Sequence, residues 1–304
     1  MDSNNNYISV IVTDYNRKEY IMEALKSVVN QSLSRENYEI ILVKNFRDEH
    51  IDTFALENKI KNIYSNDNTL SGKIIEALKI AKGKIISFLD DDDMFFKSKL
   101  EYVIKKFDSN AELCYFHNNF SGIDENGKTI AYYNENPDFN MSSISMKSDI
   151  INVDGLSKVS KSIDTLMYLY AVESGKDIVL DDEKLTYYRV TGNSVTHSFN
   201  DINSFINFSY DSLKKILVSY SNMITIFHSR KVIKILKHKI SFTKIRIKLF
   251  GISNAGFKDY LNLLATPSLE ARLYELKVAF VSIFLKKYAV KKLYENEKKK
   301  EIIL

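Results

Sequence analysis

The sequence is poor in cysteine, proline and glycine and has no tryptophan: its 304 residues include one Cys, two Pro and nine Gly. Because Cys114 is alone, the chain can form no internal disulfide, which fits a reducing compartment. The longest apolar run, residues 278–285, is interrupted by Ser282 and is too short to span a bilayer. The first ten residues lack a basic segment followed by an apolar one. We therefore expect a cytoplasmic protein without a secretory signal or a transmembrane segment.

Acidic and basic residues are unevenly distributed along the chain. Residues 1–200 carry 23 Lys and Arg against 31 Asp and Glu, a balance of −8, whereas residues 201–304 carry 20 against 8, a balance of +12. There is no acidic residue from Ser212 to Lys258. We predict two parts that face different partners: a domain at residues 1–200 and a basic helical region at residues 201–304.

Apolar strands alternate with amphipathic helices in the first hundred residues. The runs at 7–12, 38–43 and 84–89 are apolar and of strand length, and each precedes a segment whose apolar residues have helical spacing. From residue 113 onward we expect appended antiparallel strands and, further on, two short strands at 177–180 and 185–190; after about residue 200 we expect helices. The predicted fold class is α/β: a mainly parallel sheet flanked by helices, with a mostly helical C-terminal region.

The strongest local signal is the run of four aspartates, Asp90 to Asp93, at the end of an apolar strand. Carboxylates this close raise one another's pKa unless a cation lies among them. Their oxygens suit Mn²⁺ or Mg²⁺, which would bridge a diphosphate and stabilise its charge as a leaving group. Alternatively, the run is a solvated acidic turn that interacts with the positive end of the following helix.

The motifs of several other enzyme classes are missing. Neither a G-x-x-x-x-G-K-[ST] loop nor a G-x-G-x-x-G fingerprint occurs, which argues against P-loop NTPases and dinucleotide oxidoreductases. Nucleotidyl transfer would need a glycine-rich phosphate loop near the first strand, and the sequence has none there. Consecutive aspartates also cannot flank a sugar ring in the way that the paired carboxylates of glycoside hydrolases do.

Three segments, in order along the chain, resemble family 2 glycosyltransferases of the GT-A fold. The first strand and helix read SVIVTDYNRKEYIMEALKSVVNQS, and the approach to the aspartates reads NDNTLSGKIIEALKIAKGKIISFLDDDD. Tyr188-Arg189, followed by Asn193-Ser194-Val195, is similar to the family's closing YR-x-x-x-x-S element. The resemblance covers roughly residues 7–197. It implies a metal-dependent, inverting transferase that moves a sugar from a UDP- or GDP-linked donor to a glycan or a polyprenyl-linked saccharide.

The resemblance also implies roles for individual residues in donor binding. Asp92 would coordinate the Mn²⁺ or Mg²⁺ ion through a D-x-D pattern, with Asp93 in support. Asp90 would contact the ribose of the donor, and Lys73 would provide a basic side chain facing the donor. The nucleobase and ribose pocket would be lined by the end of the first strand. The residues implied in donor binding are Thr13, Asp14, Tyr15, Lys73, Asp90 and Asp91.

Asp164 stands where the family has its catalytic base, at the start of a predicted helix about 70 residues beyond the D-x-D pattern. The base accepts the proton of the acceptor hydroxyl as that oxygen attacks the anomeric carbon from the face opposite the diphosphate. A single displacement of this kind inverts the configuration. An ordinary role stays open for Asp164, since Asp is a favoured helix N-cap.

Two positions depart from the family pattern. Where the family has an Asp pair after the second strand, this chain has Lys44 and Asn45. The Asn45 amide could then recognise the nucleobase, or a nearby carboxylate, Asp48 or Asp67, could replace the missing one. Ile163 replaces the Glu that usually precedes the base. These departures keep a second hypothesis open: a degenerate, non-catalytic protein of the GT-A fold that binds nucleotide or glycan or acts as a scaffold.

The basic C-terminal region allows three interpretations. An apolar helix face flanked by lysines would suit an anionic membrane surface, with the protein peripheral on its cytoplasmic face, or a lipid-phosphate acceptor. Alternatively, the apolar stripes pack internally or against another subunit in a homo-oligomer. Nucleic acid is not expected as a partner, because basic residues do not interleave with aromatic ones in a known motif. The apolar face in question consists of Val232, Ile235, Leu236 and Ile240.

Overall fold

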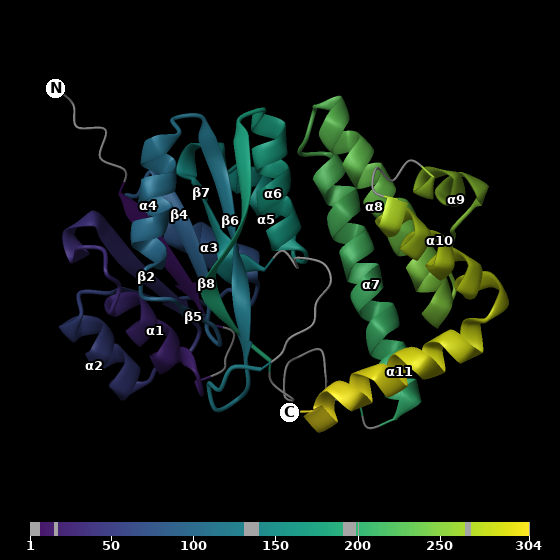
Figure 1. The fold of residues 1–304 in the computed structure, drawn as a ribbon, viewed down its shortest axis with the longest axis horizontal. Helices are drawn as coiled ribbons and strands as arrows, with labels where there is room; N and C mark the ends of the chain where they lie inside the picture. The colour runs from purple at the N-terminus through teal and green to yellow at the C-terminus, as the bar shows by residue number, and fades with distance from the viewer. Residues whose placement is uncertain are drawn as a thin grey trace. The chain divides into compact units, whose positions relative to one another are not determined.

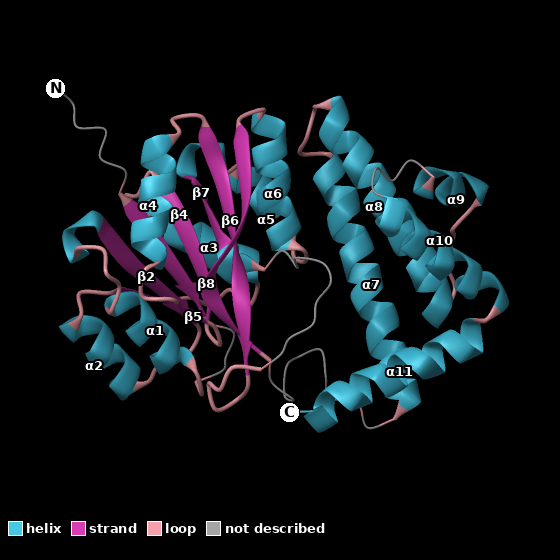
Figure 2. Ribbon diagram, viewed as in Figure 1, coloured by secondary structure: helices cyan, strands magenta, loops and turns pink. Residues whose placement is uncertain are grey.

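The computed structural model describes residues 7–14, 18–130, 140–190, 199, 201–264 and 269–303. The chain divides into two compact units, Met1–Val190 and Thr191–Leu304. The first unit is α/β and the second is helical (Figure 1 and Figure 2). The division falls at Val190, slightly before the boundary at residue 200 that the sequence predicts.

One mixed sheet of eight strands, in the order β3-β2-β1-β4-β7-β6-β8-β5, forms the centre of the first unit. Strand β1 is parallel to both β2 and β4, and β6 is parallel to β8. Strand β7 runs antiparallel to β4 and β6. The sequence predicts antiparallel strands after residue 113 but not one at 144–147. The strands are β1 (Ile8–Thr13), β2 (Tyr38–Lys44), β3 (Lys61–Tyr64), β4 (Ile85–Asp90), β5 (Met94–Phe95), β6 (Leu113–Ile123), β7 (Ile144–Lys147) and β8 (Asp177–Arg189).

Helices cover both faces of this sheet (Figure 2). Alternate residues of β1, including Val10 and Val12, pack into a core with α1, α2 and α4. Ile11 points to the opposite face, where α3 contacts β1 and β2. The helices are α1 (Ile21–Val29), α2 (Glu49–Glu57), α3 (Leu70–Leu78), α4 (Lys99–Ser109), α5 (Val153–Ser157) and α6 (Ile163–Ser174), with short 3-10 turns η1 (Arg35–Asn37), η2 (Met141–Ser143) and η3 (Ser148–Ile150).

The central strands end together at one edge of the sheet. Every residue of β1 and β2 is buried, as expected for parallel strands covered on both faces. Thr13, the last residue of β1, pairs with Val43 on one side and with Asp90 on the other. The carboxyl ends of parallel strands are where α/β folds usually bind ligands. We call this place the carboxyl edge; it comprises Thr13, Asp14, Lys44, Asn45 and the aspartates from Asp90 to Asp93.

The second unit is built around α8, which contacts all four of the other helices. Val232 and Leu236 of α8 have no exposed surface. Two members of the apolar stripe are therefore buried, whereas the other two, Ile235 and Ile240, are half-buried. No helix in the described part of the chain is long and apolar enough to cross a membrane. The helices are α7 (Ile202–Ile224), α8 (Arg230–Phe250), α9 (Phe257–Leu263), α10 (Leu269–Phe284) and α11 (Lys286–Ile303).

Candidate active site

The aspartate run turns directly at the end of β4. The backbone N–H of Asp93 donates to the carbonyl of Asp90 at 3.3 Å, which closes a tight turn. Asp91 and Asp93 are each 1% exposed, whereas Asp90 and Asp92 are half-buried. The turn therefore buries two of the four carboxylates and leaves the other two partly open to solvent, so the run is not a simple solvated acidic turn.

Arg189, the last residue of β8, anchors this turn. Its backbone N–H donates to Asp93 Oδ1 at 2.9 Å, and its Nε donates to the Asp92 carbonyl at 2.9 Å. Its Nη1 donates to the two carbonyls of residues 124–125, and its Nη2 pairs with Glu23 of α1 at 2.6 Å. The arginine side chain has no exposed surface. Arg189 belongs to the motif Tyr188-Arg189, which by itself predicts no role for the arginine; in the structure it fixes the aspartate run against α1.

A second buried cation, Lys99 of α4, lies beneath the run. Its Nζ donates to the Ser142 carbonyl and, at 3.0 Å, to Thr186 Oγ1. The Ser142 hydroxyl in turn accepts the backbone N–H of Asp90 at 3.0 Å. Burial lowers the pKa of Lys99 well below its usual value, an effect that Asp93 opposes. Lys99 was not predictable from the sequence, because a lysine on an amphipathic helix ordinarily points to solvent.

Asp93 shows the effect of crowding that the sequence predicts. Burial, with the neighbouring Asp92 charge in addition, raises the pKa of Asp93 to about 8. Asp92 and Asp90 are the partly exposed members of the run. A divalent ion that arrives with a diphosphate is typically held by one or two carboxylates, with phosphate oxygens and water completing its shell. The partly exposed pair fits such an ion.

The described residues contain no group of three or more His, Cys, Asp or Glu side chains arranged to hold a metal.

The end of β1 contacts a third buried cation. Asp14 has no exposed surface and Thr13 is 6% exposed. Lys73 of α3 is 1% exposed, and its Nζ donates to the Asp14 carbonyl. Burial lowers the pKa of Lys73, while Asp14 and Asp91 act in the opposite direction. The predicted residues Thr13, Asp14, Lys73 and Asp91 thus lie together, whereas Tyr15 lies outside the described residues.

Lys44 and Asn45, which depart from the family pattern, differ in burial. Lys44 is 2% exposed; its Nζ pairs with Asp52 Oδ1 of α2 at 2.8 Å and donates to the Phe46 carbonyl at 2.6 Å. Asn45 is half-buried, and its Nδ2 donates to Asn68 Oδ1 at 3.2 Å. Lys44 therefore joins β2 to α2, and Asn45 is the member of the pair that faces the loop before α3.

Asp48 and Asp67, the two carboxylates that could replace the missing aspartate, each make contacts within their own loop. Asp48 is the N-cap of α2, where its Oδ1 accepts the backbone N–H of Ile51 at 3.3 Å. Asp67 accepts both the N–H and the hydroxyl of Thr69, at 2.7 and 2.6 Å. These contacts hold the two loops beside Asn45 and lower the pKa of each carboxyl group.

Asp164 is the second residue of α6. Ser162 occupies the N-cap position, in a left-handed conformation with φ of 59°, so the interpretation of Asp164 as an ordinary N-cap is wrong. The half-buried Asp164 accepts the N–H of Thr165 through Oδ1 at 2.7 Å. A left-handed residue other than glycine stores strain, which is frequent near functional sites. Helix α6 contacts β6 and β8, the strand that ends at Arg189.

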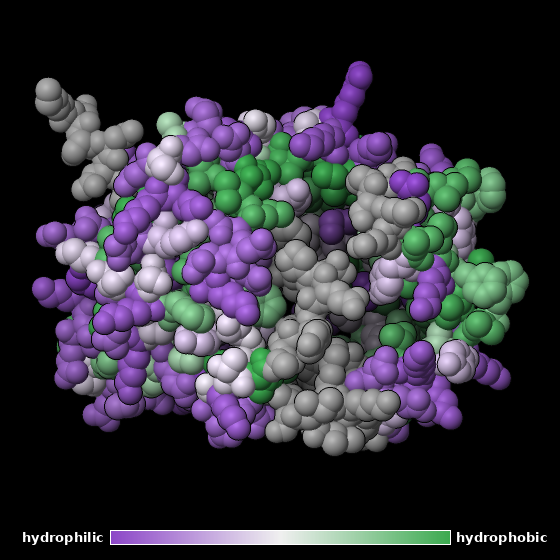
Figure 3. Space-filling view, viewed as in Figure 1, coloured by the Kyte–Doolittle hydropathy of each residue, from purple (hydrophilic) through white to green (hydrophobic). Residues whose placement is uncertain are grey.

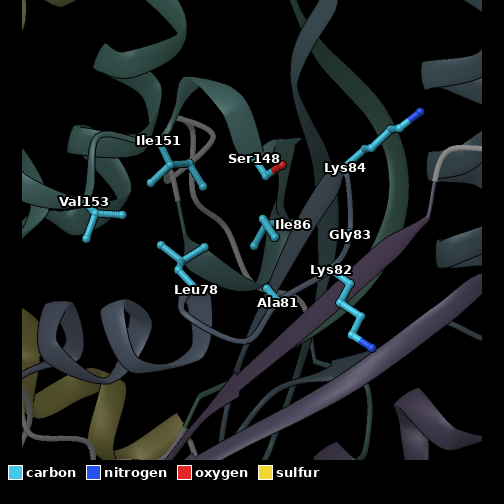
Figure 4. A pocket seen from close by; sticks show the side chains of 9 residues that line it. All are labelled: Leu78, Ala81, Lys82, Gly83, Lys84, Ile86, Ser148, Ile151 and Val153. Atoms are coloured by element: carbon cyan, nitrogen blue, oxygen red, sulfur yellow. The ribbon is translucent and has the colours of Figure 1, made fainter.

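A separate cavity of about 330 Å³ opens at the other end of β4 (Figure 4). Lys82, Gly83 and Lys84 line it before the strand begins, and Ser148 and Ile151 line its far side. None of its lining residues is acidic. Because Asp90 ends the same strand, this cavity and the carboxyl edge lie at opposite ends of β4, and the cavity has no part in the candidate site.

Comparison with known proteins agrees with this geometry. The profile described as Glycosyl transferase family 2 matches residues 9–162, about half of the chain. The chain belongs to this family. An uncharacterized glycosyltransferase of Rickettsia bellii is 33% identical over 132 residues, which are 42% of this chain and 19% of that protein. The poly(ribitol-phosphate) beta-glucosyltransferase of Bacillus spizizenii is 36% identical over 93 residues, 28% of this chain and 15% of that protein. The chain spans about a fifth of the length of the curated relatives it matches.

Solved structures confirm the α/β fold of the GT-A type. The TarS fragment of S. aureus in complex with UDP-GlcNAc superposes with a TM-score of 0.52 at 15% identity, covering 91% of this chain and 90% of that chain. The mannosyltransferase PcManGT of Pyrobaculum calidifontis, in complex with GDP-Man and Mn²⁺, gives a TM-score of 0.58 at 11% identity and covers 99% and 87%.

Proposed function

We propose that this chain transfers a sugar, with inversion, from a UDP- or GDP-linked donor to a hydroxyl of a glycan or of a lipid-linked saccharide. The aspartate run is the observation that carries the proposal, because Arg189 and Lys99 hold it at the carboxyl edge with Asp90 and Asp92 partly exposed. The nucleotide sugars bound by TarS and PcManGT, UDP-GlcNAc and GDP-Man, support a donor of this class.

In this proposal the carboxyl edge binds the donor. Asp92, a partly exposed member of the run, would hold a Mn²⁺ or Mg²⁺ ion, which would neutralise the charge on the departing diphosphate. Thr13 and Asp14 would border the nucleobase and ribose, and Asp90 would contact the ribose. Asn45 would offer its amide to the base, and Lys73, buried between Asp14 and Asp91, would keep this acidic region from repelling the donor.

Asp164 would act as the base at the acceptor side. It would take the proton of the acceptor hydroxyl as the oxygen forms a bond to the anomeric carbon and the bond from that carbon to the diphosphate breaks. The nucleotide diphosphate then leaves with the bonding electron pair. Ile163, which replaces the usual Glu, is 3% exposed and serves the core beneath α6.

The departures from the family pattern favour this proposal over a degenerate, non-catalytic protein. The Lys44 ammonium group is buried against Asp52, so it does not place a positive charge where the nucleobase would bind. Asn45 keeps a polar side chain at that position. The proposal also includes peripheral association with an anionic membrane through the basic helical unit, where a lipid-linked acceptor would be found.

A nucleotide panel tests the donor site. Calorimetry with UDP, GDP, CDP and dTDP, with and without Mn²⁺, should show metal-dependent binding of one nucleotide. Asp92→Asn should weaken that binding by about tenfold or more, because a bound ion loses its charged ligand. Asp108→Asn, on the exposed side of α4, is the matched control and should change nothing. Equal affinities with and without Mn²⁺ would contradict the metal role, and no binding of any nucleotide would favour the non-catalytic hypothesis.

A further inference from the structure

The junction of α10 and α11 exposes large apolar side chains. Phe280 and Phe284 are 55% and 66% exposed, and their rings lie 4.9 Å apart. The opposite side of α10 is packed inward, with Ala279 5% and Ser282 3% exposed. Figure 3 shows green atoms gathered over this part of the helical unit. We call this surface the α10–α11 corner; it consists of Phe280, Ile283, Phe284, Leu285 and Tyr288, each at least 46% exposed.

Lysines surround the corner and no acidic residue interrupts them. Between Glu275 and Glu295 the chain has five lysines and neither Asp nor Glu. Large apolar side chains with lysines at their margin are typical of surfaces that enter the headgroup region of an anionic bilayer to a depth of about 5–10 Å. The long lysine side chains can then extend back to the phosphates. The lysines are Lys277, Lys286, Lys287, Lys291 and Lys292, all of them exposed.

The positive charge of the corner distinguishes an anionic membrane from the other partners that an apolar surface could bind. Protein interfaces are depleted in lysine, and a symmetric contact between two copies would set these lysines against one another. A soluble polyanion would satisfy the lysines and leave the phenylalanines in water. An anionic lipid surface satisfies both, since it offers phosphates at the depth of the lysines and hydrocarbon at the depth of the rings.

We propose that the α10–α11 corner inserts into anionic membranes and holds the protein there. This gives the peripheral membrane association in the proposed function a surface other than the stripe at 232–240, in which Val232 and Leu236 are buried. The insertion requires neither donor nor sugar transfer. A vesicle experiment without nucleotide therefore tests it separately from the catalytic proposal.

The absence of tryptophan allows a direct test. Phe284→Trp would carry the only indole of the chain, and Leu56→Trp, at a position 80% exposed on α2, is the matched control. With vesicles of phosphatidylcholine containing phosphatidylglycerol, the emission of Phe284→Trp should shift to the blue, and that of Leu56→Trp should not. With phosphatidylcholine alone, neither should shift. In co-sedimentation, the double variant Phe280→Ser/Phe284→Ser and the variant Lys286→Glu/Lys287→Glu should each bind about tenfold more weakly.

Several results would overturn the proposal. An unshifted Phe284→Trp emission with anionic vesicles, while circular dichroism is native, would show that the corner does not insert. An emission already blue-shifted in buffer, together with a dimer in sedimentation velocity that Phe280→Ser/Phe284→Ser dissociates, would identify a second copy as the occupant. Equal shifts on neutral and anionic vesicles would remove the role of the lysines.

Discussion

The two units differ in the exposure of their basic side chains. At the carboxyl edge of the first unit, Lys73 and Lys99 are at most 1% exposed and Arg189 has a fully buried side chain. In the second unit, the lysines around the α10–α11 corner are all exposed. Burying a cation costs free energy that hydrogen bonds must offset, and the gain is a fixed position. Fixed cations suit a site that must orient a small donor, whereas solvated cations suit a broad anionic surface without fixed geometry.

The acidic residues follow the same contrast. In the aspartate run, Asp91 and Asp93 are buried, whereas Asp90 and Asp92 are half-buried. The carboxylate of Asp93 accepts a hydrogen bond from the backbone N–H of Arg189. The second unit carries 8 acidic residues from 201 onward, against 20 basic ones. The first unit therefore places buried cations beside the aspartates of its site. The second unit has an excess of positive charge, which an anionic partner can balance.

Asp164→Asn tests the proposed catalytic base of the first unit, and it has the largest expected effect of the variants. Loss of a general base should slow transfer by about 10²–10⁴-fold while nucleotide affinity stays unchanged. Release of nucleotide diphosphate from the donor found in the nucleotide panel, with water as acceptor, measures the rate. Asp154→Asn, in the exposed first turn of α5, is the control and should keep the wild-type rate. Activity within a few fold of wild type in Asp164→Asn would place the base elsewhere.

Most of the first unit could be predicted from the sequence, because its strands are uniform apolar runs. Strands β1, β2 and β4 follow from such runs, and the Asp run at the end of β4 points to the carboxyl edge. Strand β8 was predicted as two short strands and is one. Its middle, around Asp181 to Lys184, is polar and resembles a turn, while the structure accommodates it by shifts of register against β6.

The residues that fix the site were less predictable. Lys99 and Lys44 belong to a residue type that is nearly always solvated, and burial in a polar network leaves no trace in local spacing. Partners that are distant along the chain, such as Glu23 and Arg189, meet only in the folded protein.

Arg189→Lys tests whether the aspartate run of the first unit needs a buried arginine to hold its geometry. Lysine keeps the charge and lacks the planar fork, so it cannot donate at once to the Asp92 carbonyl, the 124–125 turn and Glu23. We expect a loss of about 1.5–3 kcal/mol in the free energy of unfolding and about tenfold weaker Mn²⁺-dependent nucleotide binding. Urea denaturation and calorimetry measure the two quantities. Arg47→Lys, at an exposed arginine over the Tyr64 ring, is the control. Unchanged nucleotide binding would mean that the aspartate run holds its geometry without the arginine.

His117 gives the first unit a contribution to stability that depends on pH, and comparison with His117→Asn isolates it. Burial, with Lys99 in addition, lowers the pKa of this 4% exposed histidine to about 4. Between pH 6.5 and 4 the unfolded chain takes up a proton that the native state refuses, so this contribution to stability is full above pH 6.5 and is lost on acidification. Relative to His117→Asn, the first unit should lose roughly 1 kcal/mol between pH 6 and pH 5. Hydrogen exchange in β6 measures this, and the exposed His50→Asn should behave as wild type. Parallel pH profiles of His117→Asn and wild type would show that His117 titrates normally.

His238 gives the second unit the opposite and smaller dependence. Its Nε2 lies 2.9 Å from Glu275 Oε1, and this hydrogen bond raises the pKa of His238, although burial and Lys239 oppose the shift. A raised pKa means that the stabilisation is fully present below the unfolded value near 6.5 and is lost as pH rises through the folded value. Hydrogen exchange in α8 and α10, corrected for intrinsic rates, should therefore show less protection at pH 8 than at pH 6. His238→Gln keeps a donor to Glu275 and cannot titrate, so its protection should not change with pH. If wild type and His238→Gln lost protection equally, His238 would not be the source of the pH response of the helical unit.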